Sequence, residues 1–314
     1  MNRIGALAQR GRQLGTLAGL GLLVLLLWAL SPFFLTVSNL SNVLEQTSIN
    51  AVIAVGMTFV ILSGGIDLSV GSLVALSGVA LAAALRAGAP LPVALLAGVA
   101  TGSAAGLCNG LLITRGKLPP FIATLGMMSV ARGVALMLAE GRPISGFSEG
   151  FRAIATERLL AIPGPVLITI VIYAVAHFVL TRTVFGRVTY AIGGNEEAAR
   201  LSGVPVRAYK TAVYGVAGLA SAAAAVVLTA RLNSAQPTAG TMYELDAIAA
   251  TVIGGSSLLG GEGSLTGTLI GALIMGVLRN GLNLLNVSSF LQQVVIGVVI
   301  IGAVAVDMGL KRKR

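Results

Sequence analysis

The feature that most constrains this chain is a succession of long apolar runs, separated by short segments that carry most of the charges. The runs cover residues 14–30, 43–62, 70–85, 91–113, 121–138, 166–180, 209–230, 245–259, 265–285 and 290–306. A helix of about 20 apolar residues crosses the hydrocarbon core of a bilayer. With 10% charged residues, the 314-residue chain has too little polar surface for a soluble fold. The sequence therefore predicts an all-α polytopic membrane protein with about ten transmembrane helices.

Two of the ten runs, 70–85 and 245–259, are short for a bilayer, and we expect them to be tilted, broken or shielded by neighbouring helices. The run at 14–30 is interpreted as a retained first span, because "SPFF" follows it where a signal peptide would have small residues.

The basic residues predict the orientation of the chain. They concentrate at Arg3, Arg10 and Arg12, at Arg115 and Lys117, in the segment 182–210, and at Lys311, Arg312, Lys313 and Arg314. The positive-inside rule places all of these on the cytoplasmic side, so both termini are expected there. The net charge of +10 therefore reflects orientation in a membrane, and no nucleic-acid partner is expected.

The longest polar segment between apolar runs, at about 182–208, contains a predicted short helix with both ends specified. Asn195 is the expected N-cap, Glu196 lies in the first turn, and Arg200 lies near the last. Gly203 suits the left-handed position that ends a helix. Ala199, Leu201 and Val204 are apolar residues of this aqueous segment, so we expect the helix to dock on a soluble partner.

Glycines recur every four residues at Gly98, Gly102, Gly106 and Gly110, and the spacing returns at Gly267 and Gly271. Small residues at this interval predict close helix packing. Two segments, 64–73 ("GGIDLSVGSL") and 260–269 ("GGEGSLTGTL"), share glycines, a hydroxyl residue and a leucine at matching offsets. They indicate either an internal duplication or convergence on the same turn chemistry.

Acidic residues near the apolar runs have two interpretations. Asp67 is expected to be an N-cap, and Glu244 to form a capping box with Thr241. Asp246 is expected in a first turn, where the helix dipole favours negative charge. Asp67 and Glu244 are also candidates for a translocation pathway. An ion-driven transporter would need such carboxylates inside its spans, and these positions give it little support.

Side-chain amides are the candidate contacts for a neutral, hydroxyl-rich solute, because they both donate and accept hydrogen bonds. Gln46 and Asn50 lie one turn apart, and Asn280, Asn283 and Asn286 are expected on one helical arc. These five residues line a pathway or join helices to one another, and the sequence leaves both interpretations open. Trp28 is the one tryptophan, so aromatic surfaces for a sugar are scarce and we expect weak binding.

Signs of enzymatic chemistry are weak. "GFSEG" at 146–150 matches a nucleophile motif and lies in a polar loop. His177, the one histidine, lies far from this loop within the apolar run 166–180. The single cysteine, Cys108, indicates neither a disulfide framework nor a metal site. A phosphate-binding GxxxxGK[ST] loop is also missing from the sequence, so any ATP would be used by a partner.

Four motifs resemble one family. They are "GMTFVILSGGIDLSVGS" (56–72), "GGNEEAARLSGV" (193–204), "SAQPTAGTMYELDAIAATVIGG" (234–255) and "GTLIGALIMGVLRNGLNLL" (267–285). They are similar to the permease subunits of bacterial ATP-binding-cassette monosaccharide importers, and most of all to the permease of ribose importers. The resemblance extends over residues 30–307.

The resemblance implies a homodimer in the bacterial cytoplasmic membrane, an ATP-binding-cassette ATPase on the cytoplasmic face, and a periplasmic or extracytoplasmic sugar-binding protein. It makes the segment 182–208 the ATPase-coupling element, with Gly193, Gly194, Asn195, Glu196, Arg200 and Gly203 as its site residues. The protein is then a non-enzymatic permease of one domain, 1–314, that imports a neutral monosaccharide by alternating access and binds no cofactor itself. An ion-coupled secondary sugar transporter is the alternative; a structural scaffold would explain neither the amides nor the capped helix.

Overall fold

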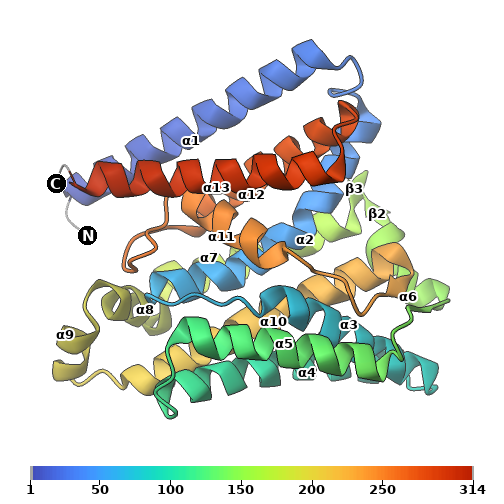
Figure 1. Ribbon diagram of the computed structural model, residues 1–314, viewed down its shortest axis with the longest axis horizontal. Helices are drawn as coiled ribbons and strands as arrows, with labels where there is room; N and C mark the ends of the chain where they lie inside the picture. Colours follow the sequence, from blue (N-terminus) through green and yellow to red (C-terminus); the bar gives the residue numbers. More distant parts are fainter. Residues whose placement is uncertain (1–2, 313–314) are drawn as a thin grey trace.

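A computed structural model describes the backbone of residues 3–312 and the side chains of residues 14–305 (Figure 1). The helices are α1 (Arg3–Leu30), α2 (Val37–Leu62), α3 (Val70–Arg86), α4 (Leu91–Thr114), α5 (Pro120–Leu138), α6 (Glu149–Thr156), α7 (Gly164–Arg182), α8 (Val184–Gly194), α9 (Glu196–Leu201), α10 (Val206–Leu232), α11 (Tyr243–Ile253), α12 (Leu265–Leu284) and α13 (Ser289–Arg312). Two antiparallel pairs of two-residue strands complete the description: β1 (Ile144–Ser145) with β4 (Ser234–Ala235), and β2 (Arg158–Leu159) with β3 (Ile162–Pro163). The predicted all-α class is confirmed.

Six helices of the described chain are long and apolar enough to cross a membrane: α2, α4, α5, α7, α10 and α12. Shorter apolar stretches lie in α1, α3 and α13, at Leu14–Leu30, Val70–Arg86 and Ser289–Ala305. The predicted count of ten spans is therefore not confirmed.

The run at 245–259 does not form one spanning helix. Helix α11 has 11 residues and ends at Ile253, because Gly254 is its C-cap and Gly255 turns the chain at φ +90°. Eleven helical residues reach only about 16 Å. The expectation that this run is short or broken is confirmed.

The bundle is built around α2 and α10. In the most apolar 18 residues of each helix, 78% of α2 and 61% of α10 are buried, compared with 22% of α4 and of α5. Helix α10 packs on α4, α2 and α3, while α12 packs on α2 and α11 (Figure 1). The outward residues of α4, α5 and α7 include many exposed Leu, Val, Ile and Phe side chains, which suits contact with lipid.

The glycines of α4 lie in its contacts with α3 and α10. A Cβ atom added to Gly102 would lie 2.6 Å from Ser77 Oγ and 2.8 Å from the Gly218 carbonyl oxygen. Gly271 of α12 similarly approaches the backbone of Ala250 in α11. The predicted packing role of the four-residue spacing is confirmed: in lipid, close backbone approach is a main source of contact energy between helices.

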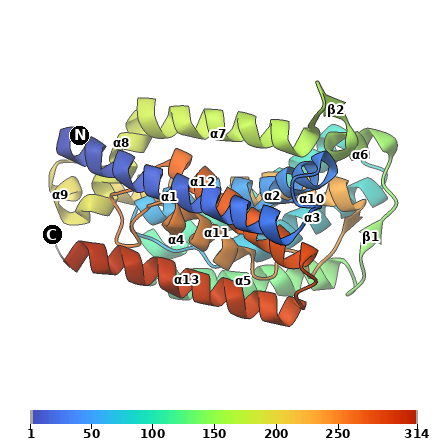
Figure 2. The same ribbon diagram turned by 90° about the horizontal axis from the view of Figure 1, so that it is seen from above.

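The molecule has two distinct ends. Helices α8 and α9 lie at one end, together with the start of α1 and the finish of α13, while α6, β2 and β3 lie at the other (Figure 2). We call these the α9 end and the α6 end. The start of α1 and the end of α13 therefore lie at the same end of the molecule as the segment predicted to be cytoplasmic. The terminal basic side chains used to predict orientation, Arg3, Arg10, Arg12 and Lys311 to Arg314, fall outside the described side chains.

Candidate functional site

The segment formed by α8 and α9 is the first candidate site. The Asn195 side chain accepts a hydrogen bond from the Ala198 N–H at 2.9 Å, which caps α9. Gly203, at φ +83°, follows the last turn in the left-handed conformation that a side chain would strain. Both predicted ends of this helix are confirmed.

Two ion pairs involve the acidic residues of α9. Glu197 and Arg200 pair within the helix at 2.6 Å, and Lys210 of α10 reaches Glu196 at 2.6 Å. The hydrogen bonds from Arg200 to Glu197, followed by the Coulomb attraction of that carboxylate, raise the pKa of Arg200 above its ordinary value. Lys210 thus connects α9 to the start of a central helix.

The apolar residues of this segment are covered unevenly. Ala199 is buried with Ile192 and Val206, and Val204 packs against the same cluster. The expectation that Ala199 and Val204 need a partner to cover them is therefore wrong, because their own chain does so. Leu201 remains 80% exposed and is the apolar side chain that α9 presents to solvent.

The end of α8 meets two other backbones at a contact that we call the glycine junction, formed by Gly64, Gly193, Gly194, Gly260 and Gly261. A Cβ atom on Gly193 would collide with the carbonyl oxygen of Leu62, the last residue of α2, and lie 2.5 Å from the Gly261 nitrogen. The Gly261 N–H donates to the same Leu62 oxygen at 3.0 Å. The end of α8 therefore contacts both the last residue of α2 and the loop before α12.

Tyr190 adds a side-chain link between α8 and that loop. Its hydroxyl donates to the Gly263 carbonyl oxygen at 2.8 Å, and burial raises the pKa of Tyr190 to about 12. Since the phenol stays protonated at neutral pH, it remains a hydrogen-bond donor.

The two similar glycine segments meet at this junction. A Cβ atom on Gly260 would lie 2.9 Å from Gly64 Cα. One segment leads into α3 and the other into α12, but their caps differ: Ser264 accepts from the Gly267 N–H, whereas Ser69 caps α3 without a side-chain bond. Internal duplication and convergence on the same turn chemistry both remain open.

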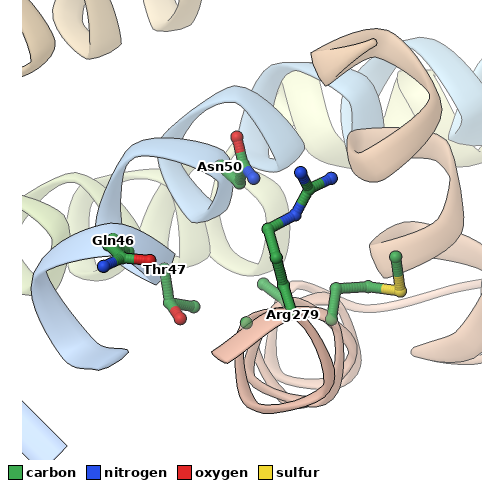
Figure 3. Close-up of a pocket in the computed structure, with 7 residues that line it drawn as sticks. Gln46, Thr47, Asn50 and Arg279 are labelled. Carbon is green, nitrogen blue, oxygen red and sulfur yellow. The ribbon is translucent and has the colours of Figure 1, made fainter. Parts of the chain in front are cut away.

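The second candidate site is a pocket between α2 and α12 (Figure 3). Its lining residues are Gln46, Thr47, Asn50, Ala272, Met275, Gly276 and Arg279. Arg279 extends from α12 toward Asn50. Its Nη2 donates to both carboxylate oxygens of Asp246 in α11, at 2.8 and 2.7 Å, and Asn50 Nδ2 donates to the same carboxylate at 3.2 Å.

This polar group was only partly predicted. Gln46 and Asn50 were named as pathway candidates, and they line the pocket, but Asp246 was assigned to a helix dipole and Arg279 to no site. Asp246 does lie in the first turn of α11, and its side chain is only 2% exposed because it pairs with Arg279. An ionisable residue inside an apolar run indicates a functional site, and Arg279 lies inside the run 265–285.

A second charged group forms around Glu45 of α2, which directly precedes the pocket residue Gln46 in the sequence. The Glu45 carboxylate pairs with Arg158 at 3.4 Å and with Arg231 at 3.7 Å. Arg158 belongs to β2 at the α6 end, so charged side chains connect this end of the molecule with the neighbourhood of Gln46.

The predicted arc of three asparagines is wrong, because α12 ends at Leu284 and Asn286 lies beyond it in a left-handed conformation. Asn280 exchanges two hydrogen bonds, at 2.9 and 3.0 Å, with Asn39 of α2. Asn283 accepts from Gln292 of α13 at 2.8 Å. The amides of Asn280 and Asn283 thus join helices.

Asp67 belongs to a separate buried cluster. Its Oδ1 accepts from the Ser69 N–H at 2.8 Å and from the Ser69 hydroxyl at 2.6 Å, while Asn109 donates to that hydroxyl at 2.9 Å. Helix α3 begins at Val70 with Ser69 as N-cap, so the N-cap prediction for Asp67 is wrong. The side chain instead orders the turn that precedes the cap.

The capping box predicted for Thr241 and Glu244 is also wrong. Met242 is the N-cap of α11, at φ +70°, and the Thr241 hydroxyl donates to the Thr238 carbonyl oxygen instead. A Cβ atom on Gly71 would lie 2.5 Å from Glu244 Oε2, so the first turns of α3 and α11 meet at this carboxylate. Glu244 is not among the residues that line the α2–α12 pocket.

Metal chemistry has no candidate within the residues that the structure describes: no three His, Cys, Asp or Glu side chains come together there. The free Cys108 is exposed on α4.

Comparisons with known proteins agree over almost the whole chain. Residues 39–304 match the family model described as "Branched-chain amino acid transport system / permease component". The ribose import permease protein RbsC of Bacillus subtilis (strain 168) is 51% identical over 298 residues, which cover 94% of this chain and 92% of that protein. The D-allose transport system permease protein AlsC of Escherichia coli (strain K12) is 40% identical, over 93% of this chain and 90% of that protein. The xylose transport system permease protein XylH of the same strain is 36% identical, over 91% and 88%. No solved structure gives a significant match.

Proposed function

This chain belongs to the branched-chain amino acid transport system permease component family, and we propose that it is the permease subunit of an ATP-binding-cassette importer of ribose. The observation that carries the proposal is the 51% identity to a ribose import permease over 94% of this chain. Relatives named for allose and xylose support a neutral monosaccharide as the cargo class. The chain is a transport subunit and not an enzyme.

The α8–α9 segment is the proposed contact with the partner ATPase. Leu201 supplies an exposed apolar anchor, and Glu197 and Arg200 surround it with charge. Asn195 and Gly203 fix the two ends of α9, while Gly193 and Gly194 connect it to α2 and α12 through the glycine junction. Closure of the ATPase on nucleotide would thereby move the bundle and alternate its access. Residues 1–314 form one permease domain, and 182–208 are its coupling segment.

The translocation pathway is proposed to include Gln46 and Asn50. Both line the α2–α12 pocket. In contrast, Asp67 is buried in a turn, Glu244 is partly buried beside Gly71 of α3, and Asn280 and Asn283 join helices. The pathway therefore depends on a few amides and not on the whole predicted set.

An ATP-binding-cassette permease implies two kinds of partner, an ATPase and a sugar-binding protein. We propose in addition that two copies of this chain form the permease, in the bacterial inner membrane, with the α9 end and both termini in the cytoplasm. Cysteines introduced by Glu197→Cys and Ser148→Cys should then be labelled from opposite sides of the membrane. Labelling of both from one side would contradict this orientation.

Reconstitution tests the function. The permease is placed in liposomes with its ATPase, and labelled ribose is supplied with the binding protein. Uptake should require ATP and both partners, and permease alone should bind neither ATP nor ribose appreciably. Saturable uptake by the permease alone, driven by an ion gradient, would instead establish a secondary transporter.

A further inference from the structure

We propose that the α2–α12 pocket, whose cavity volume of about 20 Å³ admits one hydroxyl-sized group, binds a single hydroxyl of a neutral monosaccharide in transit, with Arg279 as a sugar contact and Asp246 as its positioning residue. The inference rests on the proposed import function and adds the site at which the permease itself touches its cargo. The sequence alone did not indicate Arg279 or Asp246 as a pathway residue.

The first support is the placement of a charge inside a membrane bundle. The Arg279 side chain is 37% exposed, although Asp246 beside it is 2% exposed. Charged side chains within membrane segments face a polar cavity or a water-filled route, because contact of a guanidinium with lipid is costly. The partly open face of Arg279 therefore requires water, cargo or another polar surface.

The second support is a pair of unsatisfied polar atoms. Within the described part of the chain, Thr47 Oγ1 and Asn50 Oδ1 are buried without a hydrogen-bond partner, and both residues line this pocket. Buried polar atoms in folded proteins are nearly always bonded, so unpartnered ones indicate a missing ligand or water. Two such atoms beside one arginine mark a polar cavity that a hydroxyl group or a water can complete.

The third support is the chemical character of the set. Both hydrogen bonds from Arg279 to Asp246 use Nη2, and among the described residues no hydrogen bond uses Nε or Nη1 of Arg279. These N–H groups can donate, Asn50 Oδ1 can accept, and the Thr47 hydroxyl can do either. Ala272, Met275 and Gly276 provide an apolar wall. Donors and acceptors around so small a cavity suit one sugar hydroxyl, which can donate and accept a hydrogen bond at the same time.

Charge balance favours a neutral cargo. Asp246 already compensates Arg279, so the pair offers no net charge to a phosphorylated sugar or to a cation. The same carboxylate holds Asn50 through Nδ2, which leaves the amide oxygen of Asn50 for another partner. Asp246 thus positions both a donor, on Arg279, and an acceptor, on Asn50, without needing to touch the cargo.

The decisive variant separates a sugar contact from a structural ion pair. The charge swap Asp246→Arg with Arg279→Asp preserves a salt bridge between α11 and α12 but removes the donors from the pocket side. We expect normal insertion and ATPase association, with loss of ATP-driven ribose uptake at saturating binding protein. Wild-type uptake by a correctly assembled swap would overturn the inference, because it would show that only the salt bridge matters.

Arg279→Lys covers the case in which the swap does not fold. Lysine keeps the charge beside Asp246 but lacks the planar set of donors. Uptake should fall by about tenfold or more, while ATPase stimulation by the sugar-loaded binding protein persists. The matched control is Thr268→Val, also on α12, which removes a polar contact with Thr58 away from the pocket and should transport normally. Unchanged uptake by Arg279→Lys would contradict a sugar contact.

Site labelling supplies an independent readout. In a Cys108→Ser background, Gln46→Cys should react with a water-soluble methanethiosulfonate, and turnover with ribose-loaded binding protein should slow that reaction. Leu44→Cys, on another face of α2, should show no protection by ribose. If wild-type protein imports ribose but Gln46→Cys is not protected, the pocket inference fails and the import function stands; if wild type does not import ribose, the proposed function itself fails.

Discussion

The glycine junction is a contact between backbones, whereas the α2–α12 pocket is lined largely by polar and charged side chains. At the junction, Gly193, Leu62 and Gly261 bring three backbones together with almost no side chain between them. At the pocket, Arg279 and Asp246 meet through long or charged side chains that extend across the space between helices. The first arrangement is a rigid backbone contact, which suits the coupling role that we propose for it, whereas the second presents polar and charged groups.

The ion pairs of the two regions show the same difference. Glu197 and Arg200 pair at 2.6 Å with side chains that are 60% and 67% exposed. Asp246 and Arg279 pair at a similar distance, 2.7 Å, but Asp246 is 2% exposed. An exposed pair contributes little to folding because water competes for both charges, whereas removing one partner of a buried pair leaves a charge without solvation. The distance alone therefore does not show which ion pair contributes more to the stability of the fold.

The largest expected effect is at the junction. Gly193→Val should abolish ATP-driven uptake, since its Cβ atom would occupy the position of the Leu62 carbonyl oxygen and force α8 away from α2. Gly194→Ala is the matched control, because a Cβ atom there meets nothing within 4 Å. Uptake in liposomes and co-purification of the ATPase measure both variants. Equal activity of the two would show that the close backbone contact is not needed for coupling.

The next largest effect concerns stability in the pocket. Asp246→Ala leaves the partly exposed Arg279 without its partner and should lower the free energy of unfolding by about 2 kcal/mol, as expected for the loss of hydrogen bonds to a charged group. Thermal unfolding of the detergent-solubilised protein measures the change. Glu45→Ala provides a comparison, since that carboxylate pairs with exposed Arg158 at the longer distance of 3.4 Å. A larger loss for Glu45→Ala would reverse the assignment of the buried pair as the stronger one.

The two regions also differ in how far the sequence predicts them. Helix α9 could be predicted in detail because its determinants are local: Asn195 bonds to Ala198, three residues away, and Gly203 ends the same short segment. The glycine spacing of α4 was equally readable, since four-residue intervals place residues on one helix face.

The pocket could be predicted only in part, because its contacts join distant positions. Asn50 and Asp246 are 196 residues apart, and Asp246 and Arg279 are 33 apart. No local pattern says which amide will face which carboxylate. The errors at Asp67, Glu244 and Asn286 have a related cause: each was assigned from a helix boundary that the structure places elsewhere, at Ser69, Met242 and Leu284.

A smaller effect is expected from the cap of α9. Asn195→Ala removes the acceptor for the Ala198 N–H and should cost about 1 kcal/mol of local helix stability. Because Ala199 remains packed with Ile192 and Val206, the segment should stay folded and coupling should weaken only modestly. Hydrogen exchange of the α9 amides reports the local loss. Asn195→Asp restores an acceptor and should recover both protection and uptake. If it does not, loss of the N-cap hydrogen bond is not the cause of the effects of Asn195→Ala.

The smallest effect on folding is expected from the exposed pair on the same helix. Arg200→Gln should leave the thermal midpoint unchanged, because water solvates the released Glu197 carboxylate as well as Arg200 did. If this face docks on the ATPase, the variant should instead slow association and reduce its dependence on salt, as expected for a charge at the rim of an interface. ATPase binding measured at two salt concentrations, beside Leu201→Ser, separates the charge from the apolar anchor: Leu201→Ser should weaken binding at both. A drop in the thermal midpoint of Arg200→Gln comparable to that of Asp246→Ala would contradict this prediction. It would mean that solvent exposure does not determine how much each of the two ion pairs contributes to stability.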